Sequence, residues 1–209
     1  MIAEPSATAS VVAGARLGRP RDGAIDVALF AAIADLFTEL PPAKITLRML
    51  TARAGVTRDA FYRRYHSLGH FYVDLALNRY AVDLDFDTGS LREDLLIVQG
   101  EQAAMYGDLL ARHLLPLMIA ALGNDPSAAA DFGERFLAPR RIATVHAFER
   151  AVARGEIPPV DDVESILDLL SGPLFFRASV PGLPPIDPTF VELTVDTVLA
   201  ALRAGPEEA

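Results

Sequence analysis

The chain has 209 residues, no cysteine and a formal net charge of −9. The lack of cysteine excludes a disulfide framework, a thiolate metal site and a cysteine nucleophile. The longest apolar run, residues 114–122, contains Pro116 and is too short to span a bilayer. Because residues 1–15 also have no basic leader, we expect a soluble, cytoplasmic protein.

The negative charge is unevenly distributed along the chain. Between Arg16 and His70 there are nine Lys and Arg against five Asp and Glu, a balance of +4. The remainder has ten against twenty-three, a balance of −13. Because binding to phosphates depends on local clusters of positive charge, the acidic remainder does not exclude a nucleic-acid partner for the N-terminal region.

Apolar residues recur at helical spacing along most of the chain, which predicts an all-α fold. Residues 1–21 are expected to be a disordered tail that ends in a basic arm. The first helix is predicted over about residues 22–40, where the apolar residues form one stripe. Pro41 and Pro42 end it, because proline lacks the N–H that a helix needs.

Residues 45–65, ITLRMLTARAGVTRDAFYRRY, predict two short helices joined by a glycine turn. Thr46 and Thr57 are each placed to N-cap one helix, because a threonine hydroxyl can accept a hydrogen bond from a backbone N–H one turn inside. Gly55 suits the left-handed residue that ends the first helix. A hydrophobic staple reinforces each cap, formed by Ile45 with Leu50 and by Val56 with Phe61. The pattern is that of a helix-turn-helix.

Residues 67–209 predict a larger helical domain that begins with a connecting helix over about 67–84. Further helices are expected over 91–107, over 108–122, up to Arg154 with an interruption near Pro139, from Asp161 or Asp162 with a bend at Gly172 and Pro173, and after the loop 181–188. The last helix carries a second apolar stripe, made of Phe190, Leu193, Thr194, Thr197, Val198, Ala201 and Leu202. A surface helix has to bury such a stripe, and a partner subunit is the expected cover.

A first helix followed by a threonine-capped helix-turn-helix that ends in VTRDAFYRRY resembles the tetracycline-repressor (TetR) family of regulators, most strongly over residues 22–75. The stretch ARGEIPPVDDVESILDLLSGPLFFR, residues 153–177, also resembles a C-terminal domain type common in that family. The resemblance implies a DNA-binding module, residues 22–66, and a larger domain that binds a small ligand. It also implies a homodimer formed through the last two helices. No cofactor is expected.

The resemblance assigns roles to side chains of the helix-turn-helix. The recognition helix is residues 57–64, and its first side chains, Arg58, Asp59 and Ala60, are expected to face base edges. Arginine can bind guanine, an acidic group can accept from cytosine, and alanine can contact a thymine methyl group. Other expected DNA contacts are Arg48 and Tyr62, which match positions that touch a base or the backbone, and the phosphate group Thr46, Thr57, Arg63 and Arg64.

Several features of this sequence bear on how strongly it binds DNA. Leu68 stands where the family usually has a lysine that clamps a phosphate, so weaker binding is expected unless Arg63 and Arg64 compensate. Asp59 stands where a small residue or proline is more common, and it either selects cytosine or lowers affinity. Pro41 replaces a glycine of a turn away from the DNA. The basic arm, Arg16, Arg19 and Arg21, is a candidate for the minor groove.

Six residues on the middle helices combine apolar surface with polar groups, as ligand sites do: Tyr106, His113, Met118, Phe136, His146 and Phe175. For any single one of them, an ordinary core or surface position is the more common outcome. Since the region has few charges that indicate a particular ligand, the sequence favours an uncharged hydrophobic effector.

Other chemistry has little support in the sequence. His66 and His70 have a spacing that can bind a metal on a helix, but they straddle the expected helix start at Ser67 and lack a completing cysteine or carboxylate. There is no GxSxG, Walker loop, HExxH or Rossmann fingerprint, so neither an enzyme nor a metal site is expected.

The sequence therefore predicts a homodimeric repressor that binds a palindromic DNA operator and is released by a small molecule. The alternative is a small-molecule-binding protein of the same fold that no longer recognises DNA. Leu68, Asp59 and the acidic total favour that alternative.

Overall fold

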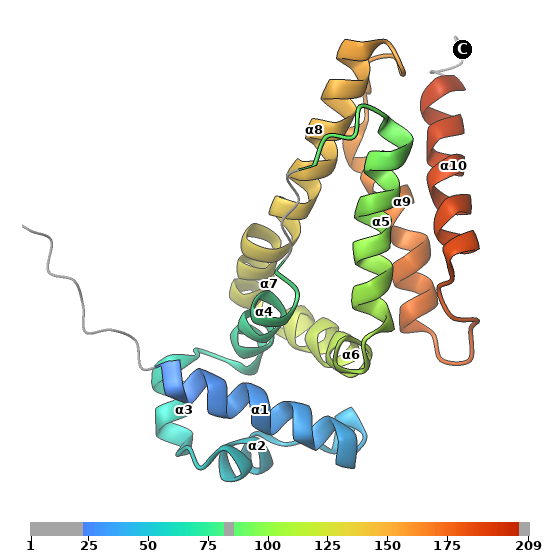
Figure 1. Cartoon of the computed structure of the whole chain (residues 1–209). Helices are drawn as coiled ribbons and strands as arrows, with labels where there is room; N and C mark the ends of the chain where they lie inside the picture. The colour runs from blue at the N-terminus through green and yellow to red at the C-terminus, as the bar shows by residue number, and fades with distance from the viewer. Residues whose placement is uncertain (1–22, 82–85, 205–209) are drawn as a thin grey trace, which may run out of the picture.

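The computed structural model describes residues 23–81 and 86–204, and every secondary-structure element in these ranges is helical (Figure 1). The all-α prediction is confirmed. The arm arginines Arg16, Arg19 and Arg21 lie outside the described residues. Within the described ranges no single helix is long and apolar enough to cross a membrane. Helices α5 (Leu91–Gly107) and α6 (Leu109–Asn124) meet that test only together, and they are bent by 87° relative to each other.

The N-terminal helices form the predicted helix-turn-helix. Helix α1 spans Gly23–Glu39, and a short 3-10 turn, Pro42–Lys44, leads to α2, Leu47–Ala54, and α3, Arg58–Arg64. Both predicted caps are confirmed: the Thr46 hydroxyl accepts from the Met49 N–H at 3.3 Å, and the Thr57 hydroxyl accepts from the Ala60 N–H at 3.1 Å. Gly55 ends α2 with a φ of 66°, the left-handed conformation that glycine adopts without strain.

The rest of the chain contains α4 (Leu68–Arg79), α5 (Leu91–Gly107), α6 (Leu109–Asn124), α7 (Pro126–Phe132), a π-helical turn (Gly133–Leu137), α8 (Ala138–Arg154), α9 (Val163–Ser179) and α10 (Pro188–Ala204). Helices α5, α8, α9 and α10 extend side by side away from the N-terminal module, while α4, α6 and α7 lie between the two parts (Figure 1). The Asp162 carboxylate accepts from the Ser165 N–H at 3.0 Å, so Asp162 and not Asp161 is the N-cap of α9.

The interruption expected near Pro139 is a change of helix type, and the chain stays helical through it. Residues 133–137 form a π-helical turn, and Pro139 is the second residue of α8. In a regular α-helix the proline ring clashes with the carbonyl four residues earlier. That carbonyl belongs to Arg135, inside the wider π-helical turn, which explains why the two features occur together.

Two hydrophobic cores hold the molecule together. The first core joins the helix-turn-helix to α4, α6 and the π-helical turn, and α4 contributes the buried residues Phe71, Tyr72, Leu75 and Ala76 to it. The second core joins α5, α8, α9 and α10. The predicted domain boundary between residues 66 and 67 therefore lies within one hydrophobic core, to which side chains from both predicted domains contribute.

A close approach between α4 and α7 fixes the start of α4. A methyl group added at Gly69 would lie 2.7 Å from the Cβ of Ala128, which is nearer than side chains pack, so only glycine fits against Ala128 here. The N-caps of both helices lie at the same place: the Nδ1 of His70 is 3.0 Å from the hydroxyl of Ser67 and 3.7 Å from the carboxylate of Asp125.

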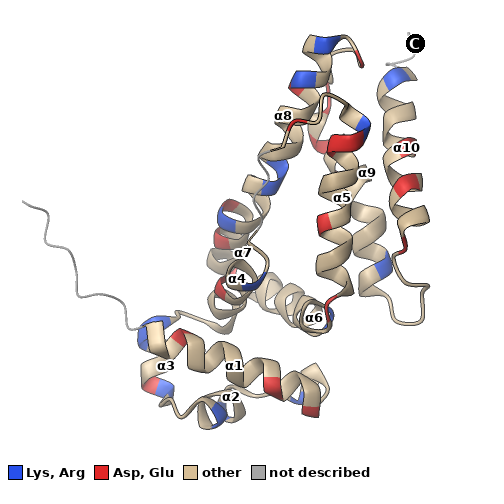
Figure 2. Cartoon of the chain, viewed as in Figure 1, with Lys and Arg blue, Asp and Glu red and all other residues tan. Residues whose placement is uncertain are grey.

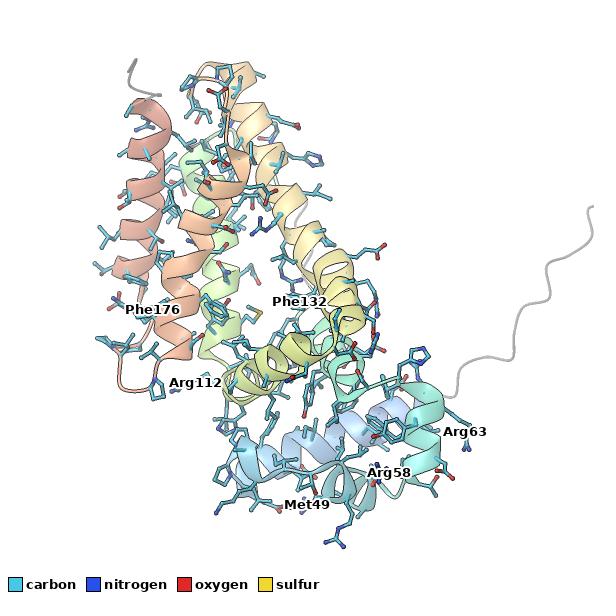
Figure 3. All side chains as sticks on the ribbon, turned by 180° about the vertical axis from the view of Figure 1, so that it is seen from behind. Met49, Arg58, Arg63, Arg112, Phe132 and Phe176 are labelled. Atoms are coloured by element: carbon cyan, nitrogen blue, oxygen red, sulfur yellow. The ribbon has the colours of Figure 1, made fainter. Side chains whose placement is uncertain are left out.

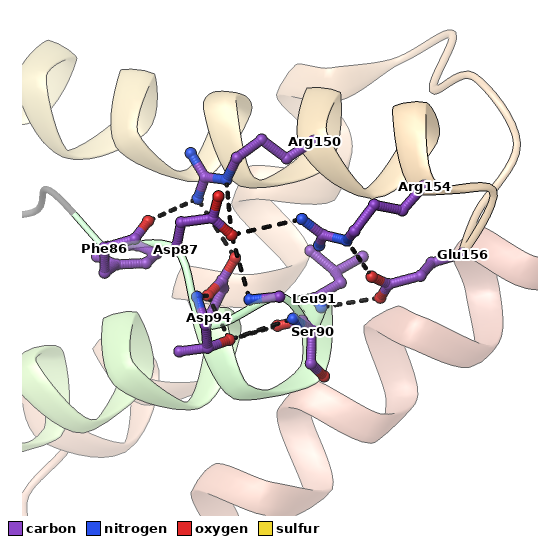
Figure 4. A network of polar contacts seen from close by, with 10 residues as sticks. Phe86, Asp87, Ser90, Leu91, Asp94, Arg150, Arg154 and Glu156 are labelled. Atoms are coloured by element: carbon purple, nitrogen blue, oxygen red, sulfur yellow. Dashed lines mark hydrogen bonds and ion pairs between the residues drawn. The ribbon is translucent and has the colours of Figure 1, made fainter.

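A polar network ties the segment before α5 to α8 (Figure 4). Its centre is the fully buried carboxylate of Asp94, which accepts from the backbone N–H and the hydroxyl of Thr88 at 2.9 and 2.7 Å. The Arg150 guanidinium lies 3.3 Å from Asp94 and donates to the Phe86 carbonyl. Burial alone would raise the pKa of Asp94, but these hydrogen bonds and the arginine lower it below its ordinary value.

We expect Asp94→Asn to lower the free energy of unfolding by about 1–3 kcal/mol, because Thr88 and Arg150 lose a charged acceptor. A lowered pKa means that this stabilisation is fully present above the unfolded-state pKa of about 4 and is lost as the pH falls through the lower folded-state value. Denaturant unfolding should therefore show a gap between wild type and variant that closes in acid. The exposed Asp161→Asn is the control, and a gap constant with pH would contradict the assignment.

Candidate nucleic-acid interface and internal cavity

Helices α2 and α3 carry several basic residues (Figure 2), and their exposed side chains include arginines and one tyrosine. Arg48, Arg58 and Arg63 are exposed and form no ion pair within the described part of the chain. Tyr62 is 44% exposed, and the Arg58 guanidinium lies 5.5 Å from the centroid of its ring. Arg58 and Arg63 point away from the rest of the molecule in Figure 3. Such a surface offers positive charge, hydrogen-bond donors and one flat ring to a partner.

The other predicted contact residues of this module occupy the two helix starts. Thr46 and Thr57 are exposed, and both hydroxyls accept a backbone N–H of their own helix. Asp59 is exposed in the first turn of α3, where a negative charge stabilises the helix end, and Ala60 beside it is half-buried. Leu68 packs against the first core, so no positive charge is available at that position.

Arg64 differs from the other predicted phosphate contacts. Its Nε and Nη2 donate to the two carboxylate oxygens of Asp26 in α1 at 2.7 and 2.6 Å, and both side chains are largely buried. The Tyr65 hydroxyl donates to the same carboxylate at 2.7 Å. Burial and this carboxylate both raise the pKa of Tyr65, so the hydroxyl stays protonated. The arginine fork is already occupied, and its geometry anchors α3 on α1.

A cavity of about 670 Å³ lies in the larger domain, between the end of α4, α5, α6, the π-helical turn, α8 and α9. Four of the six predicted ligand residues line it: Tyr106, Met118, Phe136 and Phe175. The other two are elsewhere. The ring of His113 packs on Phe37 of α1 with its centroid 5.4 Å away, and its Nδ1 is buried without a partner in the described residues. His146 is exposed, because the next two residues of α8 take the buried positions.

Sequence reasoning missed one residue that stands out in the cavity wall, Arg140. Its Nη1 donates to the Phe136 carbonyl at 2.8 Å and its Nη2 to the carbonyl of Tyr80, the C-cap of α4. Its guanidinium carbon lies 3.6 Å from the centroid of the Phe136 ring. Burial lowers the pKa of Arg140. In the sequence, an arginine near the start of a helix is expected at the surface, so no pattern predicted that Arg140 lines a cavity.

The end of α4 is also held to the start of α6 at the cavity wall. The Tyr80 hydroxyl donates to the Asp108 carboxylate at 3.0 Å, and Arg79 lies 3.1 Å from the same group. Burial would raise the pKa of Asp108, but hydrogen bonds from the Leu110 N–H and the Tyr80 hydroxyl, with the charge of Arg79, lower it. The carboxylate is thus ionised and holds α4 through polar contacts at this end.

Comparisons with known proteins agree with this architecture. Residues 86–198 match the family described as tetracyclin repressor-like, C-terminal domain. The chain is 27% identical over 166 residues to YdeS of Bacillus subtilis, an HTH-type transcriptional regulator, covering 79% of this chain and 83% of that protein. It is 29% identical over 163 residues to the DNA-binding transcriptional repressor TetR of Mycobacteroides abscessus, covering 76% and 83%.

Solved structures show the same fold. A crystal structure of a TetR family transcription regulator superposes with a TM-score of 0.61 and 24% identity, covering 84% of this chain and 97% of that one. A TetR family regulator from Pseudomonas syringae gives a TM-score of 0.55 and 19% identity, covering 90% and 98%.

Arg64→Ala should lower the free energy of unfolding by about 1.5–3 kcal/mol, because Asp26 loses a two-point charged partner. Arg63→Ala, one residue earlier and exposed, should change stability by less than about 0.5 kcal/mol. Denaturant unfolding of both variants measures the difference. Equal stability of the two variants would contradict the anchoring role of Arg64.

Proposed function

Because the chain belongs to the TetR family of DNA-binding transcriptional regulators, which are not enzymes, we propose that it is a homodimeric repressor that a small molecule releases from its operator. One observation carries the proposal: α4 shares a hydrophobic core with the helix-turn-helix, and the last residues of α4 line the cavity. A ligand that moves the end of α4 therefore acts on the DNA-binding helices. The repressor named among the relatives supports the direction of control.

On DNA, we place α3 in the major groove with its first turn toward the bases. Arg58, Asp59, Ala60, Tyr62 and, from α2, Arg48 are the base-facing group, and Thr46, Thr57 and Arg63 are the phosphate group. Exposure supports these roles for the arginines and Tyr62. We assign Arg64 instead to positioning α3, since Asp26 holds its guanidinium. The site of action is the cytoplasm, where the DNA is.

The dimer interface that we propose is the outer face of α9 and α10. Leu169 and Phe176 lie seven residues apart on α9 and are 56% and 61% exposed, and Leu193 on α10 is 60% exposed (Figure 3 labels Phe176). Large apolar side chains at this exposure indicate a surface that a partner covers. Val198, which belongs to the same predicted stripe, is buried inside the subunit and takes no part.

A ligand-binding protein that no longer recognises DNA is the second candidate. Leu68 supports it, because the side chain packs into the core and offers no charge to a phosphate. The exposed carboxylate of Asp59 at the start of α3 also supports it. A mobility-shift titration against the DNA that flanks the gene distinguishes the two, because only the regulator binds one sequence selectively with a steep salt dependence.

In that titration, Arg58→Ala should remove discrimination at one base pair, a change of about 1–3 kcal/mol, because the arginine is lost from a base edge. Arg63→Ala should lower the affinity for all DNA sequences equally and reduce the slope of log affinity against log salt concentration by about 1. Competition with single-base operator variants measures both. If neither substitution alters binding, the contact assignment is wrong.

Leu193→Glu and Phe176→Glu should each give folded monomers with much lower operator affinity, since two recognition helices must reach major grooves about 34 Å apart. Sedimentation and operator binding are measured on the same preparations. Ile142→Glu is the matched control, because Ile142 is 52% exposed but lies on α8. A monomeric variant that binds the operator as tightly as wild type would refute the dimeric mechanism.

A further inference from the structure

The cavity wall contains charged side chains of both signs. Six line it: Arg79, Glu101, Asp108, Arg140, Arg141 and Asp168. Arg79 pairs with Asp108, and Arg141 pairs with Asp168 and with Glu164. Arg140 and Glu101 form no ion pair within residues 23–81 and 86–204. These two groups are therefore the candidates for meeting a charged ligand.

Arg140 and Glu101 differ in how well water solvates them. Glu101 is exposed, so its charge is hydrated without a ligand. Arg140 is partly buried on the face of Phe136, and burial lowers its pKa. A guanidinium has five N–H donors, and the acceptors of Arg140 are two neutral carbonyls. The cavity thus holds one poorly solvated positive charge with donors to spare.

Building on the ligand-responsive function proposed above, we infer that the effector is an amphipathic anion, with an apolar body in the cavity and a carboxylate or similar group bound by Arg140. A planar guanidinium binds a carboxylate through two parallel hydrogen bonds, and such charged bonds are stronger than those to a neutral carbonyl. Tyr106 adds a second donor to the wall, because burial raises its pKa and keeps the hydroxyl protonated. An anionic effector differs from the uncharged one that the sequence favoured.

The same guanidinium offers a route from ligand to DNA. Arg140 donates to the carbonyl of Tyr80, the C-cap of α4. If an anion accepts a hydrogen bond from this N–H group instead, the end of α4 loses one hydrogen bond to the cavity wall. The contacts of Asp108 with Arg79 and Tyr80 remain. The other end of α4 packs with the helix-turn-helix, so a shift of α4 moves α3. A charged acceptor attracts the guanidinium more strongly than the Tyr80 carbonyl does, so a guanidinium that turns toward the anion gives up its contact to Tyr80.

Two fluorescent probes of one shape test the charge requirement. Anilinonaphthalene sulfonate carries an anionic group, and phenylnaphthylamine has the same aromatic body without it. Both are titrated into the full-length wild-type protein and its variants. Wild type should bind the sulfonate more tightly than the neutral probe, and this preference should shrink as salt rises. In Arg140→Met the sulfonate affinity should fall by about 10–100-fold while the affinity for the neutral probe stays the same.

Two further variants exclude indirect effects. Glu101→Gln removes the other unpaired charge of the wall and should leave sulfonate affinity unchanged or slightly higher. Arg140→Lys keeps the charge but loses the planar fork, so its sulfonate affinity should lie between wild type and Arg140→Met. If Arg140→Met does not fold, the lysine variant and the salt titration of wild type decide the question.

Operator binding measured in the presence of each probe tests whether the bound probe controls DNA binding. At equal occupancy the sulfonate should weaken operator binding by about 5–150-fold, and the neutral probe should do so much less. Equal binding of both probes to wild type, or sulfonate binding that ignores Arg140, would overturn the anionic effector while leaving a ligand cavity. If neither probe binds wild type or alters its complex with DNA, the ligand-responsive function fails as well.

Discussion

Everything that this protein is proposed to do depends on how α4 is held at its two ends. At the first end the contacts are steric: Phe71 is fully buried with its ring centroid 5.7 Å from that of Phe61 in α3, and Gly69 leaves no room for a methyl group against Ala128 of α7. Close-packed interiors transmit displacement because they do not deform continuously. Helix α4 and the DNA-binding helices are therefore expected to move as one body.

At its other end α4 is held by polar contacts. The Tyr80 carbonyl accepts from Arg140, and the Tyr80 hydroxyl and Arg79 share the carboxylate of Asp108. Hydrogen bonds of this kind contribute on the order of 1 kcal/mol each, because water competes for the same groups. A ligand can exchange such contacts at little cost, whereas it cannot repack the core at the opposite end. A small difference in affinity between two positions of α4 is then enough to shift the population.

The parts of this fold that could be predicted from the sequence are those fixed by neighbours in the chain. Thr46, Thr57 and Gly55 act on backbone groups within one turn, so their spacing is a complete description of the interaction. Arg64 and Arg140 could not be predicted in the same way. Their partners, Asp26 and Tyr80, lie 38 and 60 residues away in the sequence. The local sequence around an arginine does not show whether its side chain contacts DNA, a carboxylate or a cavity. No pattern in the sequence therefore placed a charged group in the cavity wall, where Arg140 lies.

The apolar stripe predicted on α10 shows that the pattern of a single helix does not tell which of its apolar residues are buried inside the subunit. Val198 and Leu202 are buried inside the subunit, whereas Leu193 is mostly exposed, although all three belong to one predicted stripe. The observed core face is completed by Val195 and Leu199, which the stripe omitted. Apolar residues therefore cover more of the helix surface than one interface requires. Leucine exposed on a helix that already packs on its own subunit is apolar surface in excess of one interface, and this excess supports the dimer interface proposed above.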